Sequence, residues 1–344
     1  MTTQYPDDRS RSYVVVGAGA IGGTLGHHLA RAGHHVTVVD TDSEHVRRIR
    51  EDGIVVVRGA NRTVANVAGA GTPDDGWPGT VERVLLAVKA QATGRALDWI
   101  APRLAAEGFV VSLQNGLNEA AIADRVGRER TVGAFVNLFA DLIGPGEIRD
   151  GGLGALVVGE LDGSDSRRVR EVVEDLQAWG PAKATANVSG YLWSKLGFGA
   201  MLVATALADA PMAELIDRHR SVMHALTAEV YAVASAEGVA LEPFDAFDPG
   251  PYAGTAEPAK DAATDTLVAW LRTQAKDRSG IWRDIAVRRR PTEVPTHYRP
   301  VLATAARHGI ATPGLKRLVA QIGELEAGAA MHEDRIAGLS AAPR

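Results

Sequence analysis

The stretch that most constrains this chain runs from Tyr13 to Asp40. It opens with a short apolar run rich in β-branched residues, which predicts a buried strand, and continues into glycines at positions 17, 19 and 22. A helical pattern follows and ends at Gly33, and a second apolar run, residues 35–39, ends on Asp40. Strand, glycine turn, helix, strand and acid follow one another within about thirty residues. This order predicts a βαβ unit.

Each residue of this unit has a physical reason to be there if the turn holds a dinucleotide. Gly17 permits a tight turn, Gly19 lets the backbone approach a pyrophosphate, and Gly22 lets the helix pack close to the strand. The helix N-terminus offers unpaired N–H groups to phosphates, and the acid that ends the second strand can accept ribose hydroxyls. The residues predicted to bind the cofactor here are Gly17, Gly19, Ala20, Ile21, Gly22 and Asp40.

Composition narrows the remaining possibilities. The 344 residues suffice for two domains, and a net charge of -5 gives no electrostatic footprint for nucleic acid or an anionic membrane. The chain has no cysteine, which excludes disulfides and thiolate ligands, and no HExxH-like cluster, so no metal site is expected. The polar first twelve residues do not resemble a signal peptide, and no apolar run is long enough to span a bilayer. A cytoplasmic location is the default expectation.

Periodicity divides the chain near residue 187. Before that point, strands alternate with helices, which predicts a Rossmann-type doubly wound domain over 1–187; after it, only helices are convincing, which predicts an all-α domain over 188–344. Several local expectations can be checked. They are a helix over 43–50 with Ser43 as its N-cap, a loop over 69–79, single helices over 93–106 and 212–238, and a frayed tail beyond Met331.

Two polar residues follow predicted core strands. Lys89 comes after the apolar run 84–88, and Asn115 follows the run 109–113. Ligands of open parallel sheets lie beyond the carboxyl ends of the strands, so both side chains are candidates for contact with cofactor or substrate. The alternatives are a solvated loop lysine and an ordinary Asn-Gly turn.

The stretch 191–208 is helical by pattern and apolar almost all round, and Lys195 is its only charge. Burial of an ammonium group is unfavourable and lowers its pKa unless a partner or water is near. Lys195 is therefore a candidate proton donor. The alternative is a lysine whose stem lies along apolar surface while its charge reaches water.

In these features the chain resembles the ketopantoate reductase family. The resemblance rests on the 17–22 glycine turn, Lys89-Ala, Gln114-Asn-Gly, Leu192-Trp-Ser-Lys-Leu, and Ser279…Asp284…Thr292-Glu293, and it covers about residues 12–325. It implies a Rossmann domain followed by a helical domain, an active site in the cleft, and hydride transfer from a reduced nicotinamide to a 2-keto acid. By similarity Lys195 is the general acid, and Glu293 anchors the substrate or the nicotinamide ribose. Asn115 holds the nicotinamide side and the reacting oxygen, Ser279 binds the substrate carboxylate, and Asp284 belongs to the same substrate site. A homodimer is expected.

The chain departs from the family pattern in its pocket and its cofactor signal. Gly199 and Val203 stand where relatives have substrate-binding asparagines, which predicts a roomier and less polar pocket suited to a bulkier, more apolar 2-keto acid. Asp40 favours NADH because it would repel a 2′-phosphate, whereas Lys89 would favour NADPH. Two other functions remain open. One is an alcohol dehydrogenase or a specialised ketone or imine reductase on this fold, and the other is a non-catalytic NAD(H) sensor.

Overall fold

The computed structural model describes residues 10–340 except 78 and 275, so the polar segment 1–9 and the last four residues lie outside the described part. The chain divides into two compact units, Met1–Val188 and Ser189–Arg344, which are treated separately below. Among the described residues, no helix combines the length and apolarity needed to cross a membrane. The described part also has no grouping of three or more His, Asp or Glu side chains arranged to hold a metal ion.

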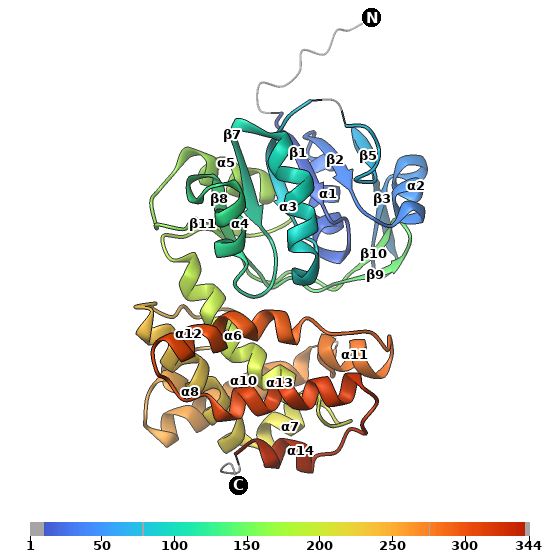
Figure 1. Cartoon of the computed structure of the whole chain (residues 1–344). Coiled ribbons are helices and arrows are strands. Elements are labelled where there is room, and N and C mark those ends of the chain that lie inside the picture. Colours follow the sequence, from blue (N-terminus) through green and yellow to red (C-terminus); the bar gives the residue numbers. More distant parts are fainter. Residues whose placement is uncertain (1–9, 78, 275, 341–344) are drawn as a thin grey trace, which may run out of the picture. The chain divides into compact units, whose positions relative to one another are not determined.

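The first unit is built on an eight-stranded sheet with helices on both faces (Figure 1). Its elements are β1 (Ser12–Val16), α1 (Ala20–Arg31), β2 (His35–Val39), α2 (Ser43–Asp52), β3 (Ile54–Arg58), β4 (Asn61–Ala65), β5 (Gly69–Gly71), β6 (Val81–Leu86), α3 (Thr93–Ile100), β7 (Leu104–Ser112), α4 (Glu119–Val126), β8 (Thr131–Val136), β9 (Ala140–Gly144), β10 (Glu147–Asp150), β11 (Leu156–Glu160), α5 (Arg167–Leu176) and β12 (Ala182–Ala184).

The order of strands in the large sheet is β12-β11-β8-β7-β6-β1-β2-β5. Strands β1, β2, β5, β6, β7 and β8 run parallel, and β11 is antiparallel to β8. The chain leaves β1 toward β2 on one side and later returns to place β6 on the other side. This reversal creates a crevice at the carboxyl ends of β1 and β6, which is where ligands of open α/β sheets bind. The predicted Rossmann-type fold is confirmed.

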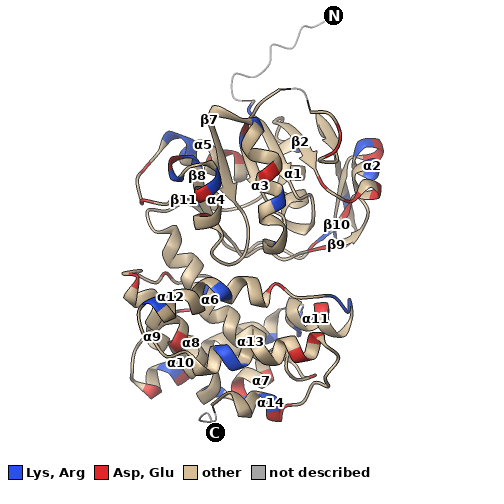
Figure 2. Cartoon of the chain, viewed as in Figure 1, with Lys and Arg blue, Asp and Glu red and all other residues tan. Residues whose placement is uncertain are grey.

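Two apolar clusters cover the two faces of the sheet. One joins the strands to α1 and α5 through residues such as Leu25, Leu29 and Val172, and the other joins them to α3 and α4 through residues such as Trp99 and Ile122. These side chains recur at helical spacing, so each helix buries one stripe against the sheet. In Figure 2, α2 and α5 are marked in both charge colours, as expected for helices that keep a polar side.

A second sheet, of order β4-β3-β10-β9, packs against α1 with all four strands. The turn at Gly144-Pro-Gly146 joins β9 to β10, which pair as antiparallel strands. Ile148 of β10 is fully buried, and a Cβ built on Gly23 would lie 2.4 Å from its Cδ1. Glycine at position 23 thus lets α1 contact this small sheet closely.

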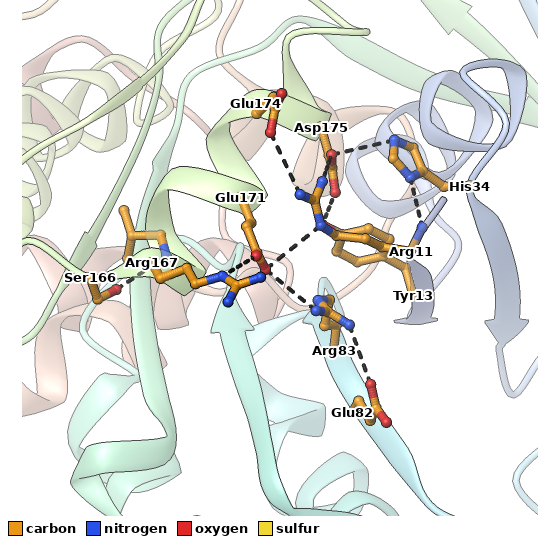
Figure 3. Close-up of polar contacts among 11 residues, drawn as sticks. Arg11, Tyr13, His34, Glu82, Arg83, Ser166, Arg167, Glu171, Glu174 and Asp175 are labelled. Carbon is orange, nitrogen blue, oxygen red and sulfur yellow. Dashed lines mark hydrogen bonds and ion pairs between the residues drawn. The ribbon is translucent and has the colours of Figure 1, made fainter. Parts of the chain in front are cut away.

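A polar network fastens α5 to the start of β1 (Figure 3). The carboxylate of Asp175 accepts hydrogen bonds from Tyr13 Oη at 2.5 Å and from the Arg11 guanidinium at 2.5 Å. Arg11 also lies 3.6 Å from Glu171, which pairs with Arg83 of β6 at 3.4 Å. Asp175 is buried, so these partners compensate a charge that would otherwise be unfavourable there.

The second unit is helical, as predicted. Its helices are α6 (Val188–Thr205), α7 (Met212–Arg218), α8 (Arg220–Ala236), α9 (Gly250–Ala253), α10 (Glu257–Thr273), α11 (Gly280–Ala286), α12 (Val294–Arg307), α13 (Pro313–Glu326) and α14 (Asp334–Ala337). Helix α8 contacts α7, α9, α10, α12 and α13. Glu229 of α8 accepts the backbone N–H groups of Gly314 and Leu315, which satisfies two unpaired donors in the first turn of α13.

Several local predictions were wrong, each for a local reason. Asp42, not Ser43, caps α2, because its carboxylate accepts the N–H groups of Glu44 and His45. The predicted loop over 69–79 contains β5, which adds an edge strand to β2. The helix predicted over 93–106 is shorter: α3 ends at Ile100, a 3-10 turn follows, and residues 104–106 belong to β7.

Two further predictions failed in the helical unit. The helix predicted over 212–238 is divided at His219 into α7 and α8. The tail predicted to fray beyond Met331 instead forms α14 and a 3-10 turn, because Ile336 and Leu339 are buried against the rest of the unit. Apolar anchors of this kind hold a chain terminus down.

Candidate active site

The glycine turn lies between β1 and α1, at the switch point of the large sheet. Gly17 has φ of +91°, a left-handed conformation that favours glycine, and a Cβ there would lie 2.7 Å from the backbone nitrogen of Val88. Its N–H donates to the carbonyl of Val39 at 2.8 Å, which ties the turn to the end of β2. No other residue type fits this position without moving the backbone.

Gly22 and Gly19 serve different purposes. A Cβ on Gly22 would lie 2.0 Å from the carbonyl oxygen of Gly17, so glycine is required for α1 to start so close to β1. No atom lies within 4 Å of the position of a Cβ on Gly19, which therefore faces open space. Ala20 and Ile21 form the first turn of α1, where backbone N–H groups are available to an anion.

Gly17 and Gly19 line a cavity of about 650 Å³ that extends past Asp40 to Lys89 and Trp99. Cavities of this size accommodate cofactors and drug-sized ligands. The open space at Gly19, the first turn of α1 and the acid at the end of β2 are the features that a dinucleotide requires. The residues present therefore fit NAD(P)H.

Asp40 is already integrated into the turn. Its Oδ2 accepts the N–H of Ala18 at 2.8 Å, and its Oδ1 accepts the N–H of Asp42 at 3.0 Å. Each carboxylate oxygen retains a lone pair, so Asp40 can still accept hydrogen bonds from ribose hydroxyls. The two backbone bonds fix the orientation of the carboxylate toward the cavity that it lines.

His45 supports the same turn and was not anticipated. Its Nε2 lies 2.9 Å from the carbonyl oxygen of Ala18, and its Nδ1 lies 2.8 Å from the N–H of Gly146. Because a backbone N–H can only donate, Nδ1 must accept and Nε2 must carry the proton. The buried ring joins the glycine turn to the small sheet. Its position on the inner face of an amphipathic helix was the available signal, but its partners could not be read from the sequence.

Lys89 and Arg95 bring positive charge to this cavity. Lys89 follows β6 by three residues and precedes a short 3-10 turn, and its side chain is exposed where it lines the cavity. Arg95 of α3 lines the same space, a role that the sequence did not indicate. The cavity is thus lined by two acidic side chains, Asp40 and Asp74, and by two basic ones.

Asn115 lies in the loop after β7. Its side chain is exposed, Gly116 has φ of +90°, and Asn118 Nδ2 donates to the Asn115 carbonyl at 2.8 Å. The Asn-Gly pair is therefore a true turn, and the turn leaves the Asn115 amide accessible. Gln114 fixes the loop by donating from Nε2 to the Val88 carbonyl at 2.8 Å.

Behind this loop lies Glu119, a buried carboxyl that the sequence did not mark. It begins α4 and is 7% exposed, and burial raises the pKa of its carboxyl to about 7. Ser112 Oγ is a nearby polar group, yet within the described part of the chain Glu119 Oε1 has no hydrogen-bond partner of ordinary geometry. The surroundings of Glu119 therefore favour the protonated, uncharged form of its carboxyl.

In the second unit, Lys195 lies on α6 between the buried side chains of Ser194 and Leu196 and is itself only partly exposed. The pKa of Lys195 is lowered to about 8. Burial lowers it, and the carboxylates of Asp245 and Glu293 offset part of that effect. A lysine tuned toward neutral pH and still accessible is suited to give up a proton. The role of general acid stays a prediction.

Glu293 precedes α12 and is half-buried. Its Oε1 lies 3.9 Å from Nε2 of His297, one turn into the same helix. Its neighbour Thr292 is anchored by Glu326 of α13, which accepts hydrogen bonds from both the N–H and the hydroxyl of Thr292 at 2.7 Å. This anchor fixes the start of α12 and therefore the place of Glu293.

Gly199 and Val203 both lie on α6, one and two turns after Lys195. A Cβ on Gly199 would lie 3.1 Å from the Tyr298 hydroxyl, and Val203 is only 2% exposed. Tyr298 Oη donates to the Leu196 carbonyl at 2.9 Å, so it is fixed in place. The Tyr298 hydroxyl therefore lies beside Gly199, while a roomier and less polar substrate pocket at these two positions stays a prediction. Neither residue can supply an amide donor, as the sequence indicated.

Ser279 and Asp284 both have structural roles in the described residues. Ser279 caps α11, its Oγ accepting the N–H of Trp282 at 3.2 Å. Asp284 accepts a hydrogen bond from Arg288 at 3.0 Å and one from Arg290 at 2.9 Å. Arg288 and Arg290 thus make local ion pairs with Asp284. Contact of Ser279 or Asp284 with substrate stays a prediction.

Comparison with known proteins now identifies the class. Residues 13–163 match the family described as "Ketopantoate reductase PanE/ApbA", and residues 187–326 match its C-terminal part. The 2-dehydropantoate 2-reductase of Halobacterium salinarum is 29% identical over 310 residues, covering 89% of this chain and 95% of the relative.

Solved structures agree. The PanE/ApbA family ketopantoate reductase of Ralstonia eutropha is 25% identical, with a TM-score of 0.76 and coverage of 92% of this chain and 98% of that one. The 2-dehydropantoate 2-reductase of Geobacter metallireducens is 27% identical, with the same TM-score and coverages of 91% and 99%. A D-mandelate dehydrogenase solved with NADH and anilino(oxo)acetate shares the fold, with a TM-score of 0.78 at 21% identity and coverages of 92% and 98%.

These matches, together with the Rossmann-type sheet and the helical unit, identify an NAD(P)H-dependent oxidoreductase acting on a keto group. The matches extend across both units and nearly the full length of the relatives. The chain belongs to the ketopantoate reductase family.

Proposed function

We propose that this protein reduces the carbonyl of a 2-keto acid to the 2-hydroxy acid and uses NADH in preference to NADPH. The observation that carries the proposal is the environment of Lys195, a partly exposed lysine in an apolar helix with two carboxylates acting on it. A lysine that served only to solubilise the helix would not need such surroundings. The relatives that are named 2-dehydropantoate 2-reductases support this reaction type.

In this reaction each of the predicted site residues has a separate role. A bound reduced nicotinamide supplies the hydride, which the carbonyl carbon accepts. Lys195 stabilises negative charge on the carbonyl oxygen as it develops and then transfers a proton from Nζ to that oxygen. Asn115 presents an exposed amide that can hydrogen-bond the carbonyl or the nicotinamide amide. Glu293 anchors the substrate or the nicotinamide ribose.

The NADH preference rests on Asp40. Its carboxylate is fixed by two backbone hydrogen bonds and lines the cavity beside Thr41 and Ser43. A 2′-phosphate beside this acid would be a like-charge contact, unfavourable by about 1–3 kcal/mol in a partly desolvated site. Lys89 and Arg95 lie in the same cavity and oppose this effect, so we expect a preference of roughly tenfold, not absolute selection.

The substrate preference rests on the lack of amide donors at Gly199 and Val203. Without such donors a hydroxylated tail would lose its hydrogen bonds to water uncompensated, whereas an apolar tail is stabilised when it leaves water. We therefore propose an apolar 2-keto acid as the preferred substrate. Because Tyr298 narrows the space beside Gly199, flat or linear side chains should be favoured over branched ones.

The test is a substrate panel followed by loss of nicotinamide absorbance. Phenylpyruvate, 2-ketohexanoate, 3-methyl-2-oxobutanoate and ketopantoate are compared with NADH and NADPH, and a cyclic imine and a simple ketone are included. The Lys195→Ala and Lys183→Ala variants run in parallel, the second as a control because Lys183 is exposed in the other unit. Turnover of apolar 2-keto acids that is lost only in Lys195→Ala supports the proposal. Ketopantoate as the best substrate contradicts the substrate preference, and turnover of only the imine or ketone contradicts the reaction.

A further inference from the structure

The segment between α8 and α9 makes a tight turn at Phe244–Phe247. Phe244 and Phe247 exchange backbone hydrogen bonds, N–H to carbonyl, at 3.1 and 2.8 Å. Asp245, at the tip of the turn, has φ of +48°, a left-handed conformation that is uncommon for residues other than glycine, asparagine and aspartate. Its side chain is exposed. The backbone of the turn thus fixes the position of the Asp245 Cα, from which the carboxylate extends.

This turn is attached to α6 on both sides of Lys195. Ser194 Oγ, one residue before the lysine, accepts the N–H of Glu242 at 3.0 Å. Phe198, three residues after it, packs its ring on Phe244 at 5.9 Å and on Phe247 at 5.1 Å between centroids. The side chains of Ser194, Phe198, Phe244 and Phe247 are all buried, so the turn is anchored to the helix at two points.

Attachment at both positions brings an acid close to the lysine. Of the charged groups that act on Lys195, Asp245 has the larger effect and Glu293, at the start of α12, the smaller one. The two carboxylates come from separate elements and oppose the effect of burial on the ammonium. The aromatic rings below the turn cannot move without disrupting the stack of Phe247 on Tyr252, whose ring planes lie 6° apart at 5.3 Å.

We propose that Asp245 is a positioning residue for Lys195, its carboxylate holding the ammonium charged and in one orientation from the tip of the Phe244–Phe247 turn. The proposal rests on the proposed function, in which Lys195 donates a proton. The loop between α8 and α9 thus has a role of its own in the proton transfer by Lys195.

The backbone at Asp245 allows the charge to be removed without disturbing the fold. Asparagine and glycine both tolerate a left-handed φ, so Asp245→Asn and Asp245→Gly keep the turn, whereas alanine would strain it. The matched control is Asp248→Asn in the same segment. Asp248 is also exposed, and its Oδ1 accepts the N–H of Gly250 at 2.9 Å, a bond that asparagine can keep.

The direct measurement is the pKa of Lys195 by NMR with lysine labelled at Cε. The chain has six lysines, so six signals are expected, and Lys195→Arg assigns the one of interest. We expect Asp245→Asn and Asp245→Gly to lower this pKa by about one unit, the effect of removing a nearby opposite charge. Asp248→Asn should leave it unchanged, and circular dichroism should show all variants folded.

Activity supplies a second readout. With the best keto acid, the pH above which kcat falls should move down with Asp245→Asn by the same amount, since only protonated Lys195 can donate. Asp245→Glu should partly restore it. A Lys195 pKa unmoved in folded Asp245→Asn and Asp245→Gly overturns the proposal even if the enzyme reduces keto acids. A lowered pKa in a protein without keto-acid turnover supports the positioning role and contradicts the proposed function instead.

Discussion

Glu119 should make the stability of this protein fall as pH rises through neutrality. In the folded chain its carboxyl is buried and its pKa is raised from 4.5 to about 7, chiefly by burial. The folded chain therefore binds the proton of the Glu119 carboxyl more tightly than the unfolded chain does. The stabilisation is fully present below pH 4.5 and is lost progressively as pH rises through about 7. A change of about 2.5 pKa units corresponds to roughly 3 kcal/mol of unfolding free energy, taken as an upper figure.

The assay compares wild type with Glu119→Gln by urea unfolding from pH 4.5 to 8.5, followed by circular dichroism. Glutamine keeps the shape of the side chain but has no titrating proton, so the difference between the two proteins isolates Glu119. We expect Glu119→Gln to gain about 3 kcal/mol relative to wild type across this range. Glu107→Gln is the control, because Glu107 lies on the same β7 that carries Ser112 but is exposed. Parallel pH curves for wild type and Glu119→Gln would refute the assignment of a protonated buried carboxyl.

The other predictions concern catalysis, cofactor and assembly. Lys195→Ala should lower kcat about a hundredfold to ten-thousandfold with little change in the Kd of NADH, as measured by steady-state kinetics and cofactor titration. The kcat of the wild type should decline above about pH 8, because Lys195 loses its proton there. Asp40→Ala should narrow the ratio of kcat/KM for NADH over NADPH, and equal wild-type values for the two cofactors would show that Asp40 does not discriminate. A homodimer predicts a mass of twice 36.3 kDa by sedimentation velocity, and a single-chain mass at micromolar concentration would contradict it.

Much of the first unit was predictable because its constraints are local in sequence. Gly17 and Gly22 are required by contacts with the strand and turn beside them, so their spacing, together with the flanking strands, the helix and Asp40, indicates the βαβ unit. The lone charge on α6 was equally visible, because an apolar helix makes any lysine conspicuous. Elements held by distant partners were less predictable: β5 exists only because β2 offers it an edge, and α14 exists only because Ile336 and Leu339 find a buried place.

The sequence by itself determined the fold class, the glycine turn, Asp40 and the candidate acid Lys195, because each depends on residue type and short spacing. Tertiary structure alone decided what surrounds them. His45 supports the turn through Gly146, one hundred and one residues away, and Asp245 acts on Lys195 from a turn fifty residues further along the chain. Burial and the electric field at a side chain depend on neighbours that are close in space and remote in sequence, and packing determines which neighbours those are.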